Sequence, residues 1–354
     1  MTRSVLVTGA AGFIGANFVY HWAEKHPDDT LVAFDALTYA GNRANLTPLE
    51  AAGRVHFVHG DICDADTVAK ALADYEVDTL VHFAAESHVD RSITGPDAFI
   101  QTNVVGTHTL LAAARTAWLS GSGKPHRFHH VSTDEVFGSL SSDAPAFTED
   151  LRYEPNSPYS ASKAGSDHLV RAYHHTYGME VTTSNCSNNY GPFHFPEKLI
   201  PLCLTNILDG LPLPVYGDGS NIRDWLYVRD HCQGIERVIE RGTVGETYNI
   251  GGNNEWANLD IVKLLCRLVD EKFAANSGLA GRFTQSPAAS GESASLIQFV
   301  EDRAGHDWRY AIDASKIERE LGFAPAETFE TGIAKTLDWY LDNEDWWRPL
   351  LKRR

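Results

Sequence analysis

The chain has 354 residues, 43% of them hydrophobic, and a formal net charge of −17. A chain of this length and apolar content can bury one large core or two modest ones. The acidic charge argues against a nucleic acid partner, since such partners are held by clustered Lys and Arg. No run of about 18 apolar residues occurs, so we expect no membrane-spanning helix.

The first residues of the chain and its cysteines indicate the cellular compartment of the protein. Residues 4–8 already form an expected strand, with no charged and apolar leader before them. The five cysteines are widely spaced and include no C-x-x-C pair. This usage is typical of free thiols in a reducing compartment, and not of a disulfide frame or a zinc site. We therefore expect a cytoplasmic protein without a metal site.

A glycine-rich turn follows this first strand. It reads GAAGFIG from Gly9 to Gly15 and leads into a helical pattern over residues 16–25. The spacing is G-x-x-G-x-x-G, and the commonest dinucleotide fingerprint is G-x-G-x-x-G. In both, glycine allows a tight turn and a close backbone approach, and the helix N-terminus favours a pyrophosphate. An ordinary glycine-rich turn between strand and helix remains the alternative at this point.

Three further apolar stretches, residues 30–34, 55–58 and 79–83, predict strands and strengthen the cofactor interpretation. The first ends at Asp35, twenty residues beyond Gly15. A carboxylate there can bind both adenosine ribose hydroxyls and repel a 2′-phosphate, which favours NAD over NADP.

The alternation of these strands with helical patterns predicts the fold class. It is an α/β fold with a Rossmann-type doubly wound parallel sheet. We place the NAD-binding domain at residues 1–190, with later segments returning to it. A smaller C-terminal substrate-binding lobe is expected at residues 191–354, where glycine and proline become frequent.

A fifth expected strand, residues 128–131, ends in a group of chemically active residues. Thr133, Asp134 and Glu135 come directly after it, at the edge where such sheets bind ligands. Tyr159 and Lys163 follow with a spacing of four, which puts both side chains on one face of a helix. The ammonium favours the ionised phenol, and the two carboxyl groups could act as an acid and a base. A solvated acidic turn is the plainer interpretation of the Asp134–Glu135 pair.

The second lobe carries candidate ligand groups of positive charge. They are Lys198, Arg223, Arg303 and His306. Near a cofactor pocket such groups suit a phosphorylated substrate, ideally a diphosphate, although solvated surface charge is the default for any one of them.

Three other segments predict structure more than chemistry. The Ala-, Ser- and Gly-rich residues 274–294 predict a flexible surface loop, and Trp346–Trp347 predicts a packing anchor for the tail. The helical patterns over residues 99–115 and 159–177 carry apolar and small residues on more than one face. We expect them to pair across a two-fold axis in a homodimer; coverage by another layer of the same chain is the alternative.

Together, the TGAAGFIG turn, Asp35, the Tyr159–Lys163 pair and NNYGP resemble the extended short-chain dehydrogenase/reductase superfamily. Within it, the chain resembles the dTDP-glucose 4,6-dehydratase family from residue 1 to about residue 340. The blocks that carry this resemblance are DALTYAGNRANL, HFAAESHVDRS, STDEVFG, SPYSASKAGSDHLVRAY, NNYGPFHFPEKLIPL, YGDGSNIRDWLYV and DRAGHDWRYAID. The chain departs from the family at Phe137, where Tyr is usual, and in the longer segment 274–294.

The resemblance implies a hydro-lyase that converts dTDP-glucose into its 4-keto-6-deoxy product. Thr133 would hold the C4 hydroxyl, and Tyr159, its pKa lowered by Lys163, would take the proton as hydride passes from C4 to NAD. Glu135 is the implied base at C5, and Asp134 the implied acid at the departing C6 hydroxyl. The hydride then returns to C6, so NAD is regenerated.

The resemblance also implies two sets of binding residues, with Arg223 and Arg303 clamping the diphosphate. The implied cofactor residues are Gly9, Gly12, Phe13, Ile14, Gly15, Asp35, Ala36, Leu37, Thr38, Asp61, Ile62, Phe83, Ala84, Ala85, Ser87, Thr102, Tyr159, Lys163 and Asn189. The implied substrate residues are Ser87, Thr133, Asn188, Glu197, Lys198, Leu199, Pro214, Tyr216, Arg223, Asn258, Arg303 and His306.

Other activities remain open from the sequence. A nucleotide-sugar 4-epimerase shares the cofactor and the Tyr–Lys pair, but it needs no acid and base for C5 and C6, so Asp134 and Glu135 favour the lyase. A non-catalytic NAD-binding protein and a simple alcohol dehydrogenase are further alternatives. The thymidine base is implied by the resemblance alone, and UDP- or CDP-glucose stays possible.

Overall fold

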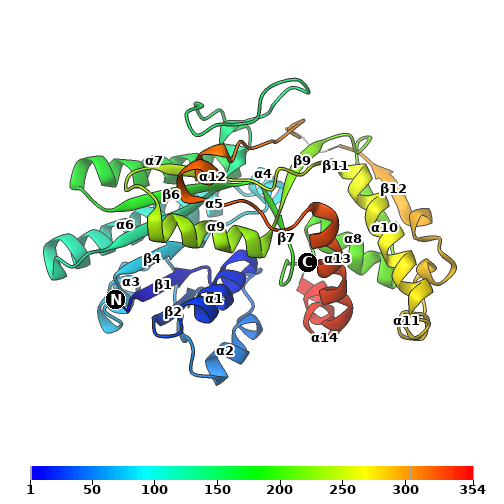
Figure 1. Cartoon of the computed structure of the whole chain (residues 1–354), viewed down its shortest axis with the longest axis horizontal. Coiled ribbons are helices and arrows are strands. Elements are labelled where there is room, and N and C mark those ends of the chain that lie inside the picture. Colours follow the sequence, from blue (N-terminus) through cyan, green and yellow to red (C-terminus); the bar gives the residue numbers. More distant parts are fainter. Residues whose placement is uncertain (1, 303–304, 354) are drawn as a thin grey trace.

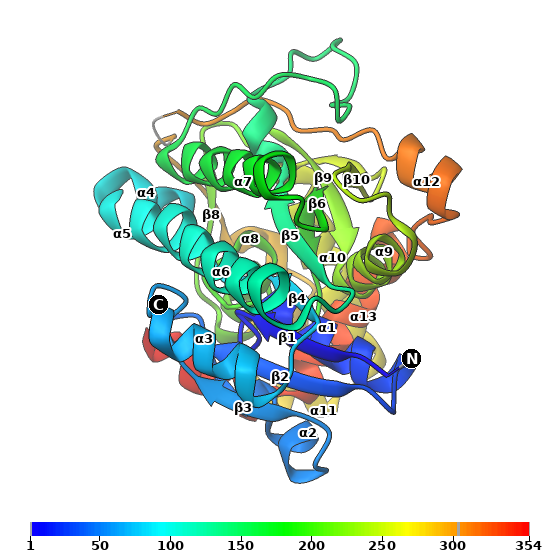
Figure 2. The ribbon, with the colours of Figure 1, turned by 90° about the vertical axis from the view of Figure 1, so that its left-hand side faces the viewer.

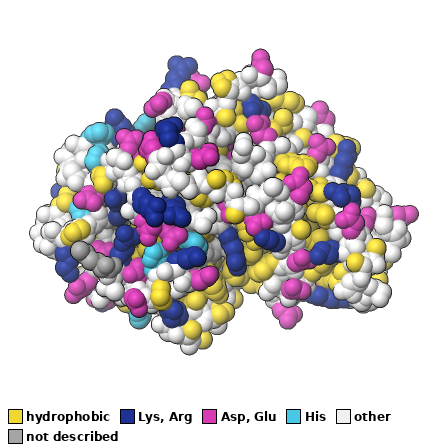
Figure 3. Space-filling model, viewed as in Figure 1, with side chains coloured by type: hydrophobic (Ala, Val, Ile, Leu, Met, Phe, Trp, Pro, Cys, Tyr) yellow, Lys and Arg dark blue, Asp and Glu magenta, His cyan; other side chains and the backbone are white. Residues whose placement is uncertain are grey.

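The structure is a computed structural model that describes residues 2–302 and 305–353. Figure 1 shows two parts side by side, a larger part that contains the N-terminus and a smaller part formed mainly by late segments. No helix in the described part of the chain has the length and apolarity needed to cross a bilayer. On the face drawn in Figure 3, basic and acidic side chains are interspersed, so this face carries mixed charge.

The larger part is built on a seven-stranded parallel sheet in the order β10-β6-β5-β4-β1-β2-β3. Its strands are β1 Ser4–Thr8, β2 Thr30–Asp35, β3 His56–His59, β4 Thr79–His82, β5 Arg127–Thr133, β6 Val181–Cys186 and β10 Thr247–Ile250. Residues of β1 and β4 are buried throughout, which is typical of strands covered on both faces.

Helices cover both faces of this sheet, as Figure 2 shows. One face carries α3 Ala65–Asp74, α6 Thr107–Arg115 and α7 Pro158–Tyr177. The other carries α1 Phe13–Lys25, α9 Val228–Arg241 and α12 Ser315–Leu321. The expected doubly wound α/β fold is therefore confirmed.

The helix expected over residues 99–115 is longer and less regular than the sequence predicts. It starts with α5 (Asp97–Phe99) and includes π-helical stretches at Ile100–Gly106 and Thr116–Ser122 on either side of α6. Short helices α2 (Thr47–Ala51) and α4 (Val89–Thr94) complete the larger part.

The smaller part has its own apolar core. Its helices are α8 Leu199–Asp209, α10 Asn258–Ala275, α11 Gly278–Arg282, α13 Phe329–Asp342 and α14 Glu344–Trp347. Strand β8 (Leu213–Tyr216) pairs in parallel with β12 (Ile297–Val300). A second small sheet, β11-β9-β7, consists of Glu255–Ala257, Ile222–Tyr227 and Asn188–Tyr190.

Later segments return to the larger part, since β10 pairs with β6 and both α9 and α12 pack on that face of the sheet. The boundary at residue 190 stays a prediction.

The prediction of a flexible surface loop at residues 274–294 is wrong. The segment contains α11 and 3₁₀ turns at Pro287–Ser290 and Ser293–Leu296. Leu279 and Phe283, four residues apart, are both buried in the core of the smaller part. Two large apolar side chains at helical spacing outweigh the loop-like composition, because their burial offsets the entropy of ordering the segment.

The tryptophan pair near the end of the chain is a packing anchor, as the sequence predicts. The Trp347 side chain is fully buried in the core of the smaller part, and its Nε1 donates to the Tyr340 carbonyl at 2.8 Å. The Trp346 Nε1 donates to Asn45 Oδ1 at 2.6 Å, which ties the tail to the larger part.

Replacing Trp347 by Ala should lower the free energy of unfolding by about 3–5 kcal/mol, because it leaves a large cavity. Urea denaturation of the variant and the parent protein measures this change. Phe299→Ala is a suitable control, since Phe299 is 57% exposed and its loss should cost much less. Equal effects of the two substitutions would contradict the anchor role.

Candidate active site

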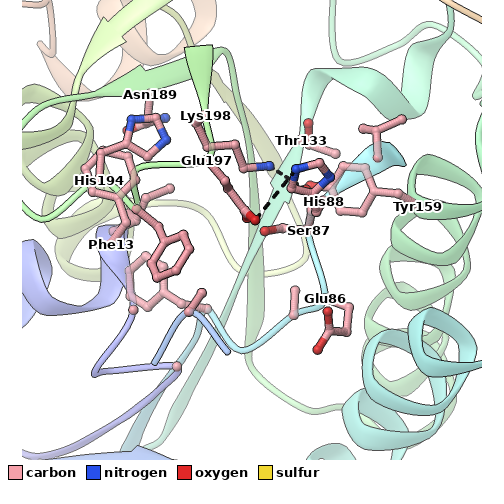
Figure 4. Close-up of a pocket in the computed structure, with 18 of the residues that line it drawn as sticks. Phe13, Glu86, Ser87, His88, Thr133, Tyr159, Asn189, His194, Glu197 and Lys198 are labelled. Atoms are coloured by element: carbon pink, nitrogen blue, oxygen red, sulfur yellow. Dashed lines mark hydrogen bonds and ion pairs between the residues drawn. The ribbon is translucent and has the colours of Figure 1, made fainter. Parts of the chain in front are cut away.

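A cleft of about 520 Å³ lies where the carboxyl ends of the parallel strands meet the smaller part. This is the edge of an open α/β sheet at which ligands bind. Figure 4 shows residues of both parts facing one another across this space, among them Tyr159 and Thr133 opposite Lys198 and His194.

Most of the predicted site residues line this one cleft. They are Gly9, Gly12, Phe13, Ile14, Gly15, Asp35, Ala36, Thr38, Asp61, Ile62, Phe83, Ala84, Ala85, Ser87, Thr102, Thr133, Glu135, Tyr159, Lys163, Asn188, Asn189, Glu197, Lys198, Leu199, Pro214, Tyr216, Arg223, Asn258 and His306.

Three predicted residues stand apart from this set. Leu37 does not line the cleft; it has a positive φ of 53° and donates its backbone N–H to Asp35 Oδ1 at 2.7 Å. Asp134 is buried behind the wall, with 1% of its surface exposed. Arg303 lies outside the described residues, so its role as a phosphate clamp stays a prediction.

The glycine turn is shaped for close packing against backbone. A Cβ on Gly9, whose φ is +65°, would lie 2.7 Å from the Ala84 nitrogen, and one on Gly15 would lie 2.2 Å from the Gly9 carbonyl oxygen. The α1 helix starts from Gly12 with no side chain capping its first N–H groups. Uncapped N–H groups and the helix dipole favour an anion at this point.

Asp35 ends β2 beside this turn. Its Oδ2 accepts the Ala11 N–H at 2.9 Å, and a Cβ on Gly41 would lie 2.8 Å from its Oδ1. Burial raises the pKa of Asp35, while hydrogen bonds from the Leu37 and Ala11 backbone oppose the rise. The uncapped helix start, the glycine cradle and this carboxylate together fit the pyrophosphate and ribose of NAD.

The loop after β4 is fixed by Asn103, a residue that the sequence analysis did not single out. Asn103 Oδ1 accepts the Glu86 N–H at 2.9 Å, and its Nδ2 donates to the Glu86 carbonyl at 3.0 Å and to Ser162 Oγ at 2.8 Å. These bonds hold the loop that contains Ala84 and Ala85 against the start of α7.

Thr133, Tyr159 and Lys163 are brought together by β5 and α7. The Thr133 side chain lies near the Tyr159 phenol and acts to lower its pKa, and the Lys163 Nζ donates to the Val131 carbonyl at 2.9 Å. Ser157 caps the N-terminus of α7, and Pro158 occupies its first turn, which fixes where the helix begins.

The expected lowering of the Tyr159 pKa is not what the surroundings of this residue produce. Burial, followed by the charge of Glu135, raises the pKa of Tyr159 well above its ordinary value. Burial also lowers the pKa of Lys163, although the charge of Asp167 opposes this. The expected lowering rested on the attraction of the ammonium, whereas desolvation of the phenol depends on burial, which a spacing of four residues does not reveal.

Asp134 and Glu135 have different surroundings despite being adjacent. Glu135 lines the cleft, and its backbone N–H donates to Thr133 Oγ1 at 3.3 Å. Burial, and then the charges of Glu135 and Asp224, raise the pKa of Asp134 well above its ordinary range. The Asp134 Oδ2 atom has no hydrogen-bond partner among the described residues. One of the two carboxyl groups is therefore held neutral, and the other faces the cleft.

Charged groups of the smaller part face the cleft from the opposite side. The Arg223 guanidinium is buried, lies 4.2 Å from the centre of the Tyr310 ring, and donates to the Ile222 carbonyl at 2.7 Å. Glu197 lies 3.3 Å from Arg91 Nη2. In Figure 4, Glu197 faces His88, whose Nε2 is 3.7 Å away, and Lys198, whose Nζ donates to the Ser87 carbonyl at 3.1 Å, lies beside them.

Several lining residues were not predicted from the sequence. His194 stacks on Phe13 with ring centres 4.1 Å apart, and burial lowers the pKa of His194 to about 3. Tyr39 and Tyr310 also line the cleft, and so does Glu86, which belongs to the segment 83–87 expected in the cofactor shell. The signal that could have found them is local, because Tyr39, His194 and Tyr310 stand inside the blocks DALTYAGNRANL, NNYGPFHFPEKLIPL and DRAGHDWRYAID, which carry the family resemblance.

A group of side chains that could hold a metal ion, His26, Glu236 and Glu240, is present among the described residues. It joins the end of α1 to α9 and does not line the cleft. Glu236 also contacts His21 at 2.8 Å, so these residues already form ion-pair contacts with one another.

Comparisons with known proteins agree with this site. A family model described as GDP-mannose 4,6 dehydratase matches residues 6–336. A dTDP-glucose 4,6-dehydratase of Escherichia coli is 53% identical over 98% of this chain and 96% of its own length, and one of Xanthomonas campestris pv. campestris is 54% identical over 98% and 95%.

Solved structures are similar over the whole chain. DesIV, a dTDP-glucose 4,6-dehydratase from Streptomyces venezuelae with NAD bound, has a TM-score of 0.86 and 49% identity, covering 98% of this chain and 100% of that one. A UDP-glucose 4-epimerase from Thermotoga maritima, 22% identical with a TM-score of 0.81 over 97% of this chain and 100% of that one, shares the fold. This chain belongs to the dTDP-glucose 4,6-dehydratase family of extended short-chain dehydrogenases/reductases.

Proposed function

We propose that the chain catalyses the NAD-dependent dehydration of dTDP-glucose to dTDP-4-keto-6-deoxyglucose. The reaction comprises oxidation at C4, loss of water across C5 and C6, and hydride return to C6. The observation that carries this proposal is the pair of unlike carboxyl groups, neutral Asp134 and cleft-facing Glu135, directly after Thr133. When bound, NAD supplies the hydride acceptor at C4 and the hydride donor at C6.

Thr133 and Tyr159 hold the C4 hydroxyl in this proposal. Both side chains line the cleft, and Thr133 is near enough to Tyr159 to influence its pKa, so two hydroxyl groups are offered on one part of the cleft wall. Tyr159 accepts the proton, and the positive charge of Lys163 favours the phenolate against the effects of burial and of Glu135.

Glu135 and Asp134 divide the elimination between them. A ketone at C4 acidifies the C5 proton, and Glu135 removes it from the cleft side. Asp134, whose neutral form burial favours, gives a proton to the departing C6 hydroxyl. Because Asp134 is 1% exposed behind the cleft wall, its side chain must turn toward the cleft when substrate is bound. An epimerase has no use for this second proton transfer, which favours the lyase.

The diphosphate of the substrate is bound by the smaller part. Arg223 and His306 line the cleft on that side, and we assign Arg303 to the same group from the family resemblance. Asn188 also lines the cleft, and its buried Oδ1 atom has no hydrogen-bond partner in the described part of the chain, so it is available to a ligand.

Incubation with dTDP-glucose deuterated at C4, with no added reductant, should give a keto sugar that absorbs in alkali. Mass spectrometry should find the deuterium retained, and NMR should place it on C6. Tyr159→Phe is the control, because it should abolish both product and transfer. Formation of dTDP-galactose without keto sugar would support the epimerase, and loss of the label to solvent would exclude internal hydride return. The same assay with UDP- and CDP-glucose tests the choice of base.

Glu135→Gln and Asp134→Asn should each lower product formation by about 10²–10⁴-fold, since each removes a proton-transfer group. They should differ in D₂O: Glu135→Gln should stop exchange of the C5 hydrogen, whereas Asp134→Asn should allow it to continue. NMR of recovered substrate measures this exchange. Glu154→Gln is a control, since Glu154 is exposed beside Arg152. Loss of C5 exchange in both variants would contradict the division of roles.

We also propose that two copies pair through α6 and α7, as the sequence predicts. Both helices lie on one face of the sheet (Figure 2), and Ile100, Val105, Leu119 and Tyr177 are each about two-fifths exposed or more on the segments 97–122 and 158–177. Pairing would bury this apolar surface. A cytoplasmic location is proposed on the five free cysteines, which suit a reducing compartment.

Val105→Arg should convert the dimer into a single chain, because a charge would be buried at the centre of the contact. Size-exclusion chromatography with light scattering measures the mass. Leu211→Arg is the matched control, since Leu211 has similar exposure in the smaller part and should leave the mass unchanged. A single-chain mass for the parent protein would overturn the dimer.

A further inference from the structure

A buried group of polar side chains lies behind the catalytic pair and takes no part in the reaction described above. It is centred on Asp167, which follows Lys163 by four residues on α7, so both side chains share one face of the helix. Asp167 is 6% exposed and does not line the cleft. A carboxyl group this deeply buried needs a physical reason, because burial of an unpaired charge is costly.

The Asp167 carboxyl group is held by donors on its side of the sheet. Ser132 Oγ donates to Asp167 Oδ2 at 2.8 Å, and His130 Nε2 lies 3.1 Å from Oδ1. His130 and Ser132 are two residues apart on β5, so both point to the face that α7 covers. The Tyr153 hydroxyl adds a third hydrogen bond.

These donors stabilise the ionised carboxylate. Burial raises the pKa of Asp167 to about 6, while the charge of Lys163 and the bonds from Ser132 and Tyr153 oppose the rise. Asp167 therefore carries its negative charge at neutral pH, one helical turn from Lys163 and near enough for the two charges to interact.

Lys163 can stay charged in this buried position only if a negative charge lies nearby. It is 4% exposed, and its ammonium donates a hydrogen bond to the neutral Val131 carbonyl. Titratable groups surround the two residues on several elements. They are His82 on β4, His130 on β5, Asp134 and Glu135 directly after β5, Tyr153 before α7, Tyr159 and His168 on α7, and Cys186 on β6.

Most of these neighbours are neutral and cannot balance an ammonium. Burial lowers the pKa of His82 and of His130 far below the ordinary value, so both imidazoles are uncharged. Burial raises the pKa of Cys186 and of Tyr153, so the thiol and the phenol keep their protons.

We propose that Asp167 is the buried counter-ion of Lys163 and, through it, a positioning residue for proton transfer at Tyr159. The proposal rests on the proposed function for the part played by Tyr159. Asp167 touches neither substrate nor cofactor; it keeps Lys163 charged, and the charged Lys163 favours the phenolate. The network on β5 and α7 thus supports the proton acceptor from behind the cleft.

Asp167→Asn tests the proposal. Without the negative charge, Lys163 should lose its proton at lower pH, so the basic limb of the kcat profile should move down by about 1–3 pH units. The KM for dTDP-glucose should not change, because Asp167 lies outside the cleft wall. Asp167→Glu retains the charge and should restore much of the profile.

Labelling of amines with acetic anhydride, read by mass spectrometry across a pH series, follows Lys163 without any turnover. The pH of half-labelling of Lys163 should fall in Asp167→Asn, whereas that of Lys70, which is 74% exposed, should stay the same. This readout separates the two proposals. Absence of product in the parent protein would count against the dehydratase activity, whereas the labelling of Lys163 would still show whether Asp167 is its counter-ion.

Asp230→Asn is the matched control, since Asp230 is equally buried on α9 and does not line the cleft. It should change neither the limb nor the labelling of Lys163. If Asp167→Asn does not fold, Asp167→Ser provides a neutral variant with room for water. An unmoved limb and unmoved labelling in a folded neutral variant would overturn the proposal and leave Asp167 a purely structural role.

Discussion

Desolvation at the carboxyl end of β5 is the constraint on which the rest of the site depends. Asp134, Tyr159 and Lys163 are all buried there, and burial disfavours the charged form of each. It raises the pKa of Asp134 and of Tyr159 and lowers the pKa of Lys163. For Asp134 this outcome is useful, because a neutral carboxyl group has a proton to give. For Tyr159 it is a cost, because a proton acceptor at neutral pH must be able to ionise.

The fold supplies the geometry in which this cost can be offset. In a parallel sheet covered on both faces, the strand ends form one wall, and the helices that follow begin beside it. Helix α7 therefore starts at the cleft with Tyr159 and continues behind β5, where Lys163 and then Asp167 lie on the same face. In the proposed mechanism, one helix carries the proton acceptor Tyr159, the ammonium of Lys163 and its counter-ion Asp167 at successive turns, and β5 provides Ser132 and His130 as hydrogen-bond partners of Asp167.

Much of this could be predicted from the sequence because it is encoded locally. The apolar runs and the glycine turn located β1, β2, β4 and β5 to within one or two residues, and the spacing of four located the Tyr159–Lys163 pair. What could not be predicted depends on burial or on distant partners. The sign of the Tyr159 shift depends on desolvation, and the Asn103 and Tyr310 contacts join segments far apart in the chain. The order of segment 274–294 was not predicted, because its Ala, Ser and Gly content is typical of a loop. The two apolar residues that fix the segment, Leu279 and Phe283, pack against residues elsewhere in the chain.

The choice between elimination and epimerisation depends on individual side chains in the cleft and not on the fold. In the proposed function, the sheet, the cofactor turn and the Tyr–Lys pair account for oxidation at C4, and a 4-epimerase would need the same features. The next step depends on whether a ketone at C4 finds a base and an acid nearby. Glu135 faces the cleft, and Asp134, one residue away, is turned into the protein and held neutral. We therefore propose that these two adjacent carboxyl groups take opposite roles because the chain turns between them, and that this turn, more than the surrounding architecture, directs the ketone toward loss of water.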